Sequence, residues 1–245
     1  MAETTGIAWC DATFNPWIGC TKVSAGCANC YAERDNKRYS WVSGWGKGAP
    51  RRLTSAENWK KPLAWARDAV KRGVTKRVFC ASLADVLDDE VSQEWRRDLF
   101  SLINETGKIG GLEWLLLTKR DKNFHLLPSG WVDYPPDYVR IGVTAENQAQ
   151  WDIRVPRLVD GWPGKNFVSV EPMLSRVIPL QQVDWIIVGC ESGPNARETD
   201  PNWIECMRYD CESFGIPFFL KQMMQDGALV KEPVFKGRKW LEFPK

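Results

Sequence analysis

Short apolar runs alternate with longer helical segments along most of this 245-residue chain. The runs that predict strands are 77–82, 114–118, 139–143, 166–170, 184–188 and 217–220, and the helical segments expected around them are 31–38, 62–72, 91–104, 147–158 and 201–214. Strands that alternate with helices pair in parallel, because each crossover helix returns the chain to the same side of the sheet. The pattern therefore predicts an α/β fold with six or seven parallel strands. A single barrel-like domain commonly has this length.

Polar residues follow the end of nearly every predicted strand. They are Asp85, Lys119, Arg120, Thr144, Glu146, Glu171, Glu191, Ser192, Lys221 and Gln222. In parallel barrels the loops at the carboxyl ends of the strands converge on one face. A charged residue at a strand end is often only part of a solvated turn, but repetition at successive ends favours a shared site.

Three cysteines near the N-terminus, Cys20, Cys27 and Cys30, have the spacing C-x6-C-x2-C in a glycine-containing loop. A structural zinc takes four protein ligands, whereas a [4Fe-4S] cluster on three thiolates leaves one iron able to bind another molecule. The sequence favours the cluster. A zinc site completed by a remote ligand such as Cys10 or Cys80 stays open, as does a set of ordinary buried or reactive thiols.

The segments beside this loop carry a family resemblance. Phe14-Asn15-Pro16-Trp17 precedes the loop and Tyr31-Ala32-Glu33-Arg34 follows it. Together with the three cysteines they resemble a phage-associated three-cysteine-motif family of unknown function, and the loop resembles that of the radical S-adenosylmethionine (SAM) superfamily. That superfamily usually has C-x3-C-x2-C with an aromatic residue before the third cysteine. Here the first gap is six residues and Asn29 occupies the aromatic position.

The resemblance implies a single-domain partial (βα)6 TIM-type barrel with parallel strands over residues 1–245, with the cysteine loop after its first strand. It implies a [4Fe-4S] cluster and SAM as cofactors, and a flavodoxin- or ferredoxin-like protein as electron donor. Reduction of the cluster would cleave SAM to methionine and a 5′-deoxyadenosyl radical, which abstracts hydrogen from a substrate in the barrel mouth. A second cluster motif is not found, so an auxiliary cluster is not expected.

Candidate SAM contacts follow from the order of the strands. A carboxylate is needed near the SAM ammonium group, and hydroxyl, amide or carboxylate groups are needed near its ribose. The candidates are Ser82 and Asp85 for the amino group, Thr144 and Glu146 for the ribose, Glu171 and Glu191 for SAM or the substrate, and Tyr31 beside the third cysteine.

The substrate is less constrained, because the net charge of +2 gives no global field for nucleic acid. Basic residues that could hold phosphates are Lys119, Arg120 and Lys221, with Lys122, Arg51 and Arg52 as further members, and Trp41, Trp45 and Trp59 could stack on bases. A merely solvated basic rim is the alternative. With the phage association that the resemblance implies, a nucleobase or nucleotide is the preferred substrate class.

Two other functions stay open: a zinc-stabilised nucleic-acid-binding module, and a non-catalytic iron–sulfur partner subunit. Eight cysteines without a signal peptide predict a reducing, cytoplasmic setting. No apolar run approaches the roughly 20 residues that span a bilayer, and a single histidine, His125, leaves little for a histidine-rich metal site. Residues 40–61 are expected to be a surface insertion, and 231–245 a C-terminal hairpin or tail.

Overall fold

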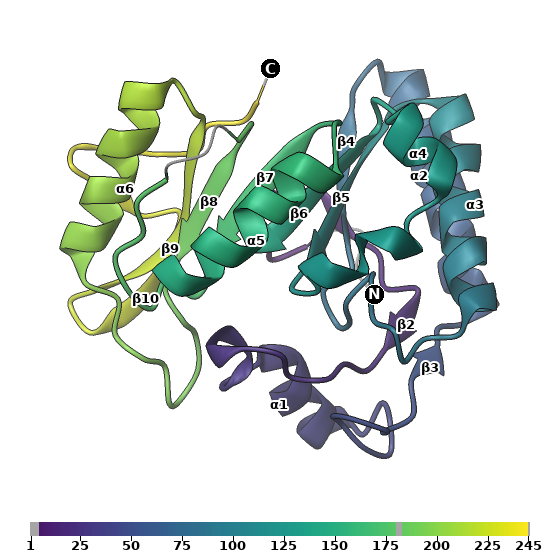
Figure 1. The fold of residues 1–245 in the computed structure, drawn as a ribbon, viewed down its shortest axis with the longest axis horizontal. Helices are drawn as coiled ribbons and strands as arrows, with labels where there is room; N and C mark the ends of the chain where they lie inside the picture. Colours follow the sequence, from purple (N-terminus) through teal and green to yellow (C-terminus); the bar gives the residue numbers. More distant parts are fainter. Residues whose placement is uncertain (1–4, 180–182, 245) are drawn as a thin grey trace.

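The computed structural model describes residues 5–179 and 183–244, and its centre is a curled, mostly parallel sheet (Figure 1). The strands lie side by side in the order β1-β4-β5-β6-β7-β8-β9-β10. They are Ala12–Thr13 (β1), Lys76–Cys80 (β4), Leu112–Thr118 (β5), Val139–Thr144 (β6), Asn166–Val170 (β7), Ile186–Gly189 (β8), Phe218–Gln225 (β9) and Ala228–Lys231 (β10). All neighbours pair in parallel except β10, which is antiparallel to β9. The predicted partial barrel with parallel strands is confirmed.

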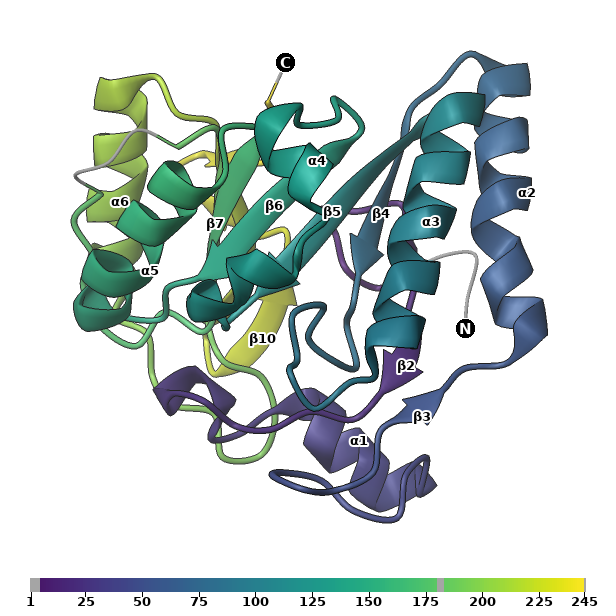
Figure 2. The ribbon, with the colours of Figure 1, turned by 45° about the vertical axis from the view of Figure 1, so that its right-hand side comes forward.

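Helices pack against the outer face of this sheet (Figures 1 and 2). They are α2 (Ala56–Arg72), α3 (Gln93–Ile109), η2 (Asp121–Leu126), α4 (Ser129–Asp133), α5 (Gln148–Gly161) and α6 (Pro201–Phe214). Helix α1 (Tyr31–Tyr39) and the short turn η1 (Ala25–Cys27) lie apart from this layer, across one end of the sheet. Strand β2 (Trp17–Ile18) pairs with β3 (Arg52–Leu53) beside them. The N-terminal segment therefore covers this end of the sheet.

Side-chain caps determine where several helices begin. Ser55 accepts a hydrogen bond from the backbone N–H of Asn58, so α2 begins at Ala56. The prediction that this helix begins at Pro62 is wrong, because Pro62 lies inside the helix. The predicted end is correct: Gly73 adopts the left-handed conformation that ends many helices.

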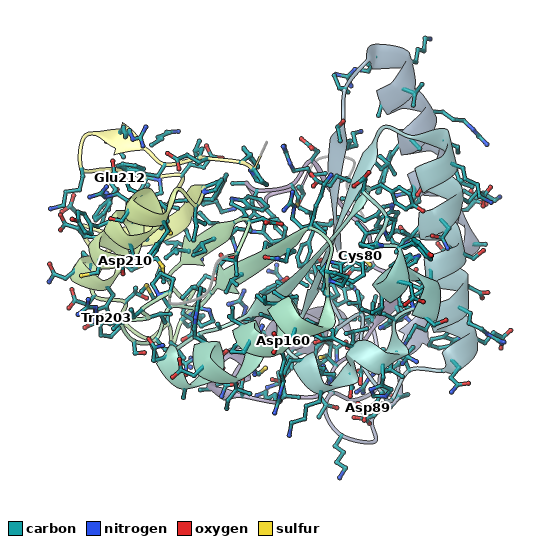
Figure 3. The ribbon with its side chains drawn as sticks, turned by 45° about the horizontal axis from the view of Figure 1, so that its top comes forward. Cys80, Asp89, Asp160, Trp203, Asp210 and Glu212 are labelled. Carbon is teal, nitrogen blue, oxygen red and sulfur yellow. The ribbon has the colours of Figure 1, made fainter. Side chains whose placement is uncertain are left out.

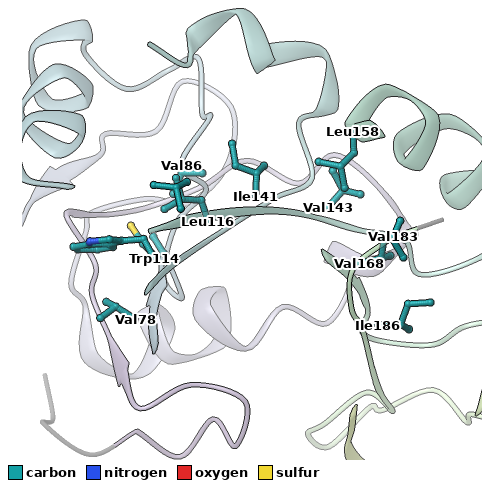
Figure 4. Packing of buried hydrophobic residues seen from close by; sticks show 14 of the residues in the cluster. Val78, Val86, Trp114, Leu116, Ile141, Val143, Leu158, Val168, Val183 and Ile186 are labelled. Carbon is teal, nitrogen blue, oxygen red and sulfur yellow. The ribbon is translucent and has the colours of Figure 1, made fainter. Parts of the chain in front are cut away.

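The sheet separates two hydrophobic layers, because successive residues of a strand point to opposite faces. Val78, Ile141 and Val168 belong to the outer, helix-covered layer shown in Figure 4. The inner layer is aromatic, and it contains Trp9, Phe79, Phe167, Trp185 and Phe219. Trp9 and Trp185 meet edge to face, with ring centroids 6.4 Å apart. This aromatic layer fills the inside of the curled sheet.

The chain after α6 contains more β-strand than predicted. Strand β9 continues to Gln225 and turns back through Asp226 and Gly227, both of which have positive φ, into β10. A short antiparallel pair, β11 (Val234–Phe235) and β12 (Arg238–Lys239), follows. Lys245, the last residue of the predicted tail, lies outside the described residues. Among the helices that the structure describes, none has the length and apolar character needed to cross a membrane.

Candidate functional site

A cavity of about 550 Å³ lies at the carboxyl ends of the parallel strands. This volume falls within the range of roughly 300–1,000 Å³ that is usual for small-molecule sites. The cavity is lined by Cys20, Cys27 and Cys30 and by strand-end residues. The predicted residues that also line it are Tyr31, Trp45, Ser82, Asp85, Lys119, Arg120, Thr144, Glu171, Ser192, Lys221 and Gln222. Glu146 and Glu191 are not among the lining residues.

The three cysteines reach the cavity from one loop and are all free thiols. Cys27 ends the turn η1, and Cys30 is the residue before α1. Within residues 5–179 and 183–244, no group of three or more His, Cys, Asp or Glu side chains is arranged to hold a metal ion. A single zinc needs ligands that converge on one atom, whereas the thiolates of a [4Fe-4S] cluster bind separate irons. Three sulfur donors line this one cavity, which is the number of protein thiolates that a cluster with one open iron takes.

The two cysteines considered as remote zinc ligands are directed elsewhere. Cys80 is fully buried in the outer hydrophobic layer, within the body of the sheet in Figure 3. Cys10 donates its thiol hydrogen to the carbonyl of Ile7, and burial raises the pKa of Cys10 to about 12. Neither side chain lines the cavity.

Arg120 lies behind Cys20 and holds the start of the cysteine loop. Its Nη1 lies 3.5 Å from Cys20 Sγ, and its Nη2 donates to the carbonyl of Thr21 at 3.1 Å. Burial raises the pKa of the Cys20 thiol to about 12, although the Arg120 cation acts in the opposite direction. Arg120 is itself buried and forms ion pairs with Asp85 (3.1 Å) and Asp88 (3.4 Å). These contacts make it a support of the loop as well as part of the cavity lining.

The Asp85 carboxylate joins the ends of β4 and β5. Its Oδ1 accepts hydrogen bonds from Leu87 N and Thr118 Oγ1, and its Oδ2 accepts one from Lys119 N and pairs with Arg120. A carboxylate offers about four acceptor positions. Four protein donors already surround this one, so Asp85 serves as a structural connection at the cavity edge.

Glu146 lies beneath the cysteine loop, fully buried. Its Oε1 accepts the backbone N–H of Gly26 at 2.8 Å, and its Oε2 pairs with Arg154 at 2.9 Å. Burial opposes ionisation of this carboxyl, but hydrogen bonds from the loop and the Arg154 cation lower its pKa. The loop packs closely on Glu146 at Gly26, because a Cβ added to Gly26 would lie 3.0 Å from Glu146 Cδ. The structure thus places this predicted ribose contact against the loop.

Glu191 anchors the other end of the loop. Its carboxylate accepts from Asn29 Nδ2 at 2.9 Å and from the backbone and guanidinium of Arg197. Although burial opposes ionisation, these donors lower the pKa of Glu191 to about 2. Asn29 and Arg197 were not predicted. Asn29 occupies the motif position at which an aromatic residue is usual, and this departure was the available signal.

A second group of strand-end residues faces the cavity. Glu171 pairs with Lys221 at 2.8 Å and accepts a hydrogen bond from Ser169. The buried hydroxyl of Thr144 makes no hydrogen bond to any residue that the structure describes. Ser169 was not predicted, although it points inward from β7 with Phe167, two residues earlier. Gly189 leaves room for Glu171, since a Cβ there would lie 2.7 Å from Glu171 Oε1.

Tyr31 and Ser82 form another part of the cavity wall. The Tyr31 hydroxyl donates to the Ser82 carbonyl at 2.6 Å, and Ser82 Oγ accepts from Asn15 at 2.9 Å. These contacts join the first residue of α1 to the segment after β4. They fix the distance between the cysteine loop and the sheet.

Two residues proposed for substrate binding have other environments. The Arg51 side chain is only 2% exposed and pairs with Asp88 at 2.8 Å and Glu90 at 3.1 Å. Trp59 packs edge to face on Phe14, against the outer hydrophobic core. The predictions of a phosphate contact at Arg51 and of a stacking surface at Trp59 are therefore wrong.

One protein-family model matches residues 4–244 of the chain. The chain belongs to DUF5131, a family described as proteins of unknown function. No curated protein matches this DUF5131 chain in sequence. Solved structures of spore photoproduct lyase are similar in fold: a tyrosine-to-phenylalanine mutant, and a cysteine-to-alanine mutant alone or with dinucleoside spore photoproduct. Each has a TM-score of 0.53 and covers 85% of this chain and 75% of its own, at 12–13% sequence identity.

Proposed function

We propose that this protein is a radical SAM-type enzyme with a [4Fe-4S] cluster on Cys20, Cys27 and Cys30. The observation that carries the proposal is that three free cysteines of one loop line one cavity at the carboxyl ends of parallel strands. The sequence resemblance of the loop supports it. So does the similarity in fold to spore photoproduct lyase, a radical SAM enzyme.

A cluster bound by these three cysteines would supply the electron for reductive cleavage of SAM. Arg120, Glu146 and Glu191 would each act on a different part of the cysteine loop that holds the cluster. Arg120 donates toward Cys20 Sγ, and such hydrogen bonds to ligand sulfurs adjust the potential of a cluster. Glu146 and Glu191 hold the loop through Gly26 and Asn29. They act in this proposal by positioning the cysteines.

The cavity wall offers polar groups for SAM and the substrate. Glu171 is the carboxylate for a cationic or hydroxyl group of the ligand, and Lys221, 2.8 Å away, balances its charge. The Thr144 hydroxyl is a free donor and acceptor for a ribose hydroxyl. Lys119 and Lys221 are the basic lining residues suited to a phosphate.

A nucleobase or nucleotide is the proposed substrate class. The supporting observation is the dinucleoside photoproduct bound by one of the structurally similar proteins. A cytoplasmic setting with a flavodoxin- or ferredoxin-like electron donor belongs to the same proposal, since free thiols and an open iron require reducing conditions.

The test is anaerobic reconstitution with iron and sulfide, followed by iron analysis and EPR spectroscopy with and without SAM. Wild type should bind about four irons per chain and show an EPR signal that SAM perturbs. Cys27→Ala should lose the cluster. Cys206→Ala is the matched control, because Cys206 is a partly exposed thiol on α6, outside the cavity; it should behave as wild type.

Product analysis separates the alternatives. With dithionite and SAM, the reconstituted protein should form 5′-deoxyadenosine. Stoichiometric zinc in place of iron would overturn the proposal in favour of a zinc-stabilised binding module. A cluster whose EPR signal does not respond to SAM, in a protein that yields no 5′-deoxyadenosine, would overturn it in favour of a non-catalytic iron–sulfur subunit.

A further inference from the structure

One face of α1 leads out of the cavity. Tyr31, Asp35 and Tyr39 are spaced four residues apart and so share this face of the helix. Tyr31 and Asp35 line the cavity. Tyr39 lies one turn further, roughly 6 Å along the helix axis from Asp35, and its side chain is exposed. The face therefore continues from the cavity wall onto the open surface.

An aromatic pair, made of the exposed Tyr39 and the partly buried Trp41, lies at the outer end of this face. Tyr39 is 54% exposed and lies nearly parallel to Trp41, with ring centroids 5.3 Å apart and an angle of 20° between the planes. The other ring pairs between described residues are tilted or edge to face, and most belong to the buried core. The guanidinium of Arg38 lies 5.1 Å from the Tyr39 ring centroid. Trp45, in the same loop as Trp41, lines the cavity.

We propose that Tyr39 and Trp41 form a stacking platform for single-stranded nucleic acid, placed beside the nucleotide that the cavity holds. This inference rests on the proposed function, since it assigns the cavity a nucleotide. Flat aromatic surfaces bind unstacked bases of any sequence, and the strand's phosphates need cations nearby. Lys37, Arg38 and Lys47 are exposed cations on α1 and the loop that follows it.

Geometry favours a single strand over a duplex. Asp35 at the cavity and Tyr39 in the platform are roughly 6 Å apart along the axis of α1. One or two nucleotide steps, at roughly 3.4 Å per stacked step, span this length. A base must leave its stack to enter the cavity, and its neighbour then needs a new surface to stack on. The Tyr39 and Trp41 rings supply that surface at the rim.

Binding can be tested without iron or SAM. A short fluorescein-labelled oligothymidylate is titrated with the apo-protein at low salt, and anisotropy is recorded. The double variant Tyr39→Ala/Trp41→Ala should bind about tenfold to hundredfold more weakly than wild type, as expected for loss of one or two stacking contacts. The double variant Tyr39→Phe/Trp41→Phe keeps the rings and should retain binding. Tyr209→Ala is the matched control, since Tyr209 is an exposed tyrosine on α6.

The outcomes distinguish this inference from the proposed function. Equal affinity of wild type and the double alanine variant overturns the platform, as does tighter binding of the matching duplex. No binding to the oligonucleotide, in a protein that still forms 5′-deoxyadenosine, overturns the platform alone. Ring-dependent binding in a protein that binds zinc and cleaves no SAM supports the platform and overturns the radical SAM function.

Discussion

Two groups of strand-end residues at the same edge of the sheet are used in different ways. The loop support consists of Asp85, Arg120, Glu146 and Glu191, and the cavity wall consists of Ser82, Thr144, Ser169, Glu171 and Lys221. In the loop support, each side chain is surrounded by partners from the protein, such as Gly26 N–H on Glu146. In the cavity wall, the Thr144 hydroxyl has no hydrogen-bond partner among the described residues, and the Glu171–Lys221 pair lines the cavity. Polar residues at strand ends therefore do not all indicate ligand contacts.

The composition of the cysteine loop explains why it needs such support. Between Cys20 and Cys30 the one large apolar side chain is Val23, and it is 45% exposed. A loop that buries little apolar surface gains little from the hydrophobic effect. It is held by hydrogen bonds instead, at Thr21, Gly26 and Asn29. Hydrogen bonds to the loop support therefore stabilise the loop, whereas hydrophobic packing stabilises the helices.

Glu146→Ala should have the largest effect on stability. It removes the nearest carboxylate of the Arg154 cation, whose side chain is 3% exposed, and leaves only the more distant Asp121, at 3.6 Å, among the ion pairs described. It also removes the acceptor of Gly26 N–H. Loss of one partner of a buried ion pair costs roughly 3–5 kcal/mol. We expect a lower midpoint in urea and in thermal unfolding, together with poor iron incorporation on reconstitution.

Glu146→Gln provides the control for this change. The glutamine can still accept from Gly26 but carries no charge, so it should fall between wild type and the alanine variant. If Glu146→Ala unfolds at the same urea concentration as wild type, Glu146 does not support the loop and the distinction between the two groups fails.

Glu191 should make stability depend on pH. Its pKa is about 2 in the folded protein, below its usual value of 4.5. A carboxyl whose pKa is lowered by folding adds stability above its usual pKa and loses that contribution as pH falls toward the folded value. We expect wild type to exceed Glu191→Gln by about 1–2 kcal/mol near neutral pH, after allowing for the partly exposed Arg197. The difference should shrink between pH 4.5 and 2, measured as urea midpoints at each pH. A difference that stays constant over this range would show that Glu191 acts without its charge.

Much of the fold was predictable because local signals agree with one another. The predicted bounds of α6 are correct, since Pro201 stands at its start, Asp200 caps it and Gly215 ends it. The bounds of β7 are also correct. The hairpin after β9 was missed, although Asp226-Gly227 is a strong turn signal between apolar runs.

The division of the site was not predictable from strand order. Glu146 and Gly26 are 120 residues apart, and Asn29 and Glu191 are 162 apart. Strand order places a carboxylate at the edge of the sheet, but it does not tell which loop will donate to it. One local hint exists that the carboxylate is already paired. Arg154 follows the strand-end Glu146 by about two helical turns and forms an ion pair with it.

Glu171→Gln should have the smallest effect on stability and separate the cavity wall from the loop support most sharply. Glu171 pairs with Lys221, and the two side chains are 12% and 21% exposed at the cavity. Glutamine keeps the shape and can accept from Ser169, so we expect a change of about 1 kcal/mol or less. Iron content after reconstitution should equal that of wild type, because no contact joins Glu171 to the cysteine loop among the hydrogen bonds and ion pairs described. The change should appear in the response of the EPR signal to SAM, which should need more SAM to saturate. A loss of stability as large as that of Glu146→Ala, with iron lost as well, would move Glu171 into the loop support and overturn its assignment as the carboxylate for the ligand.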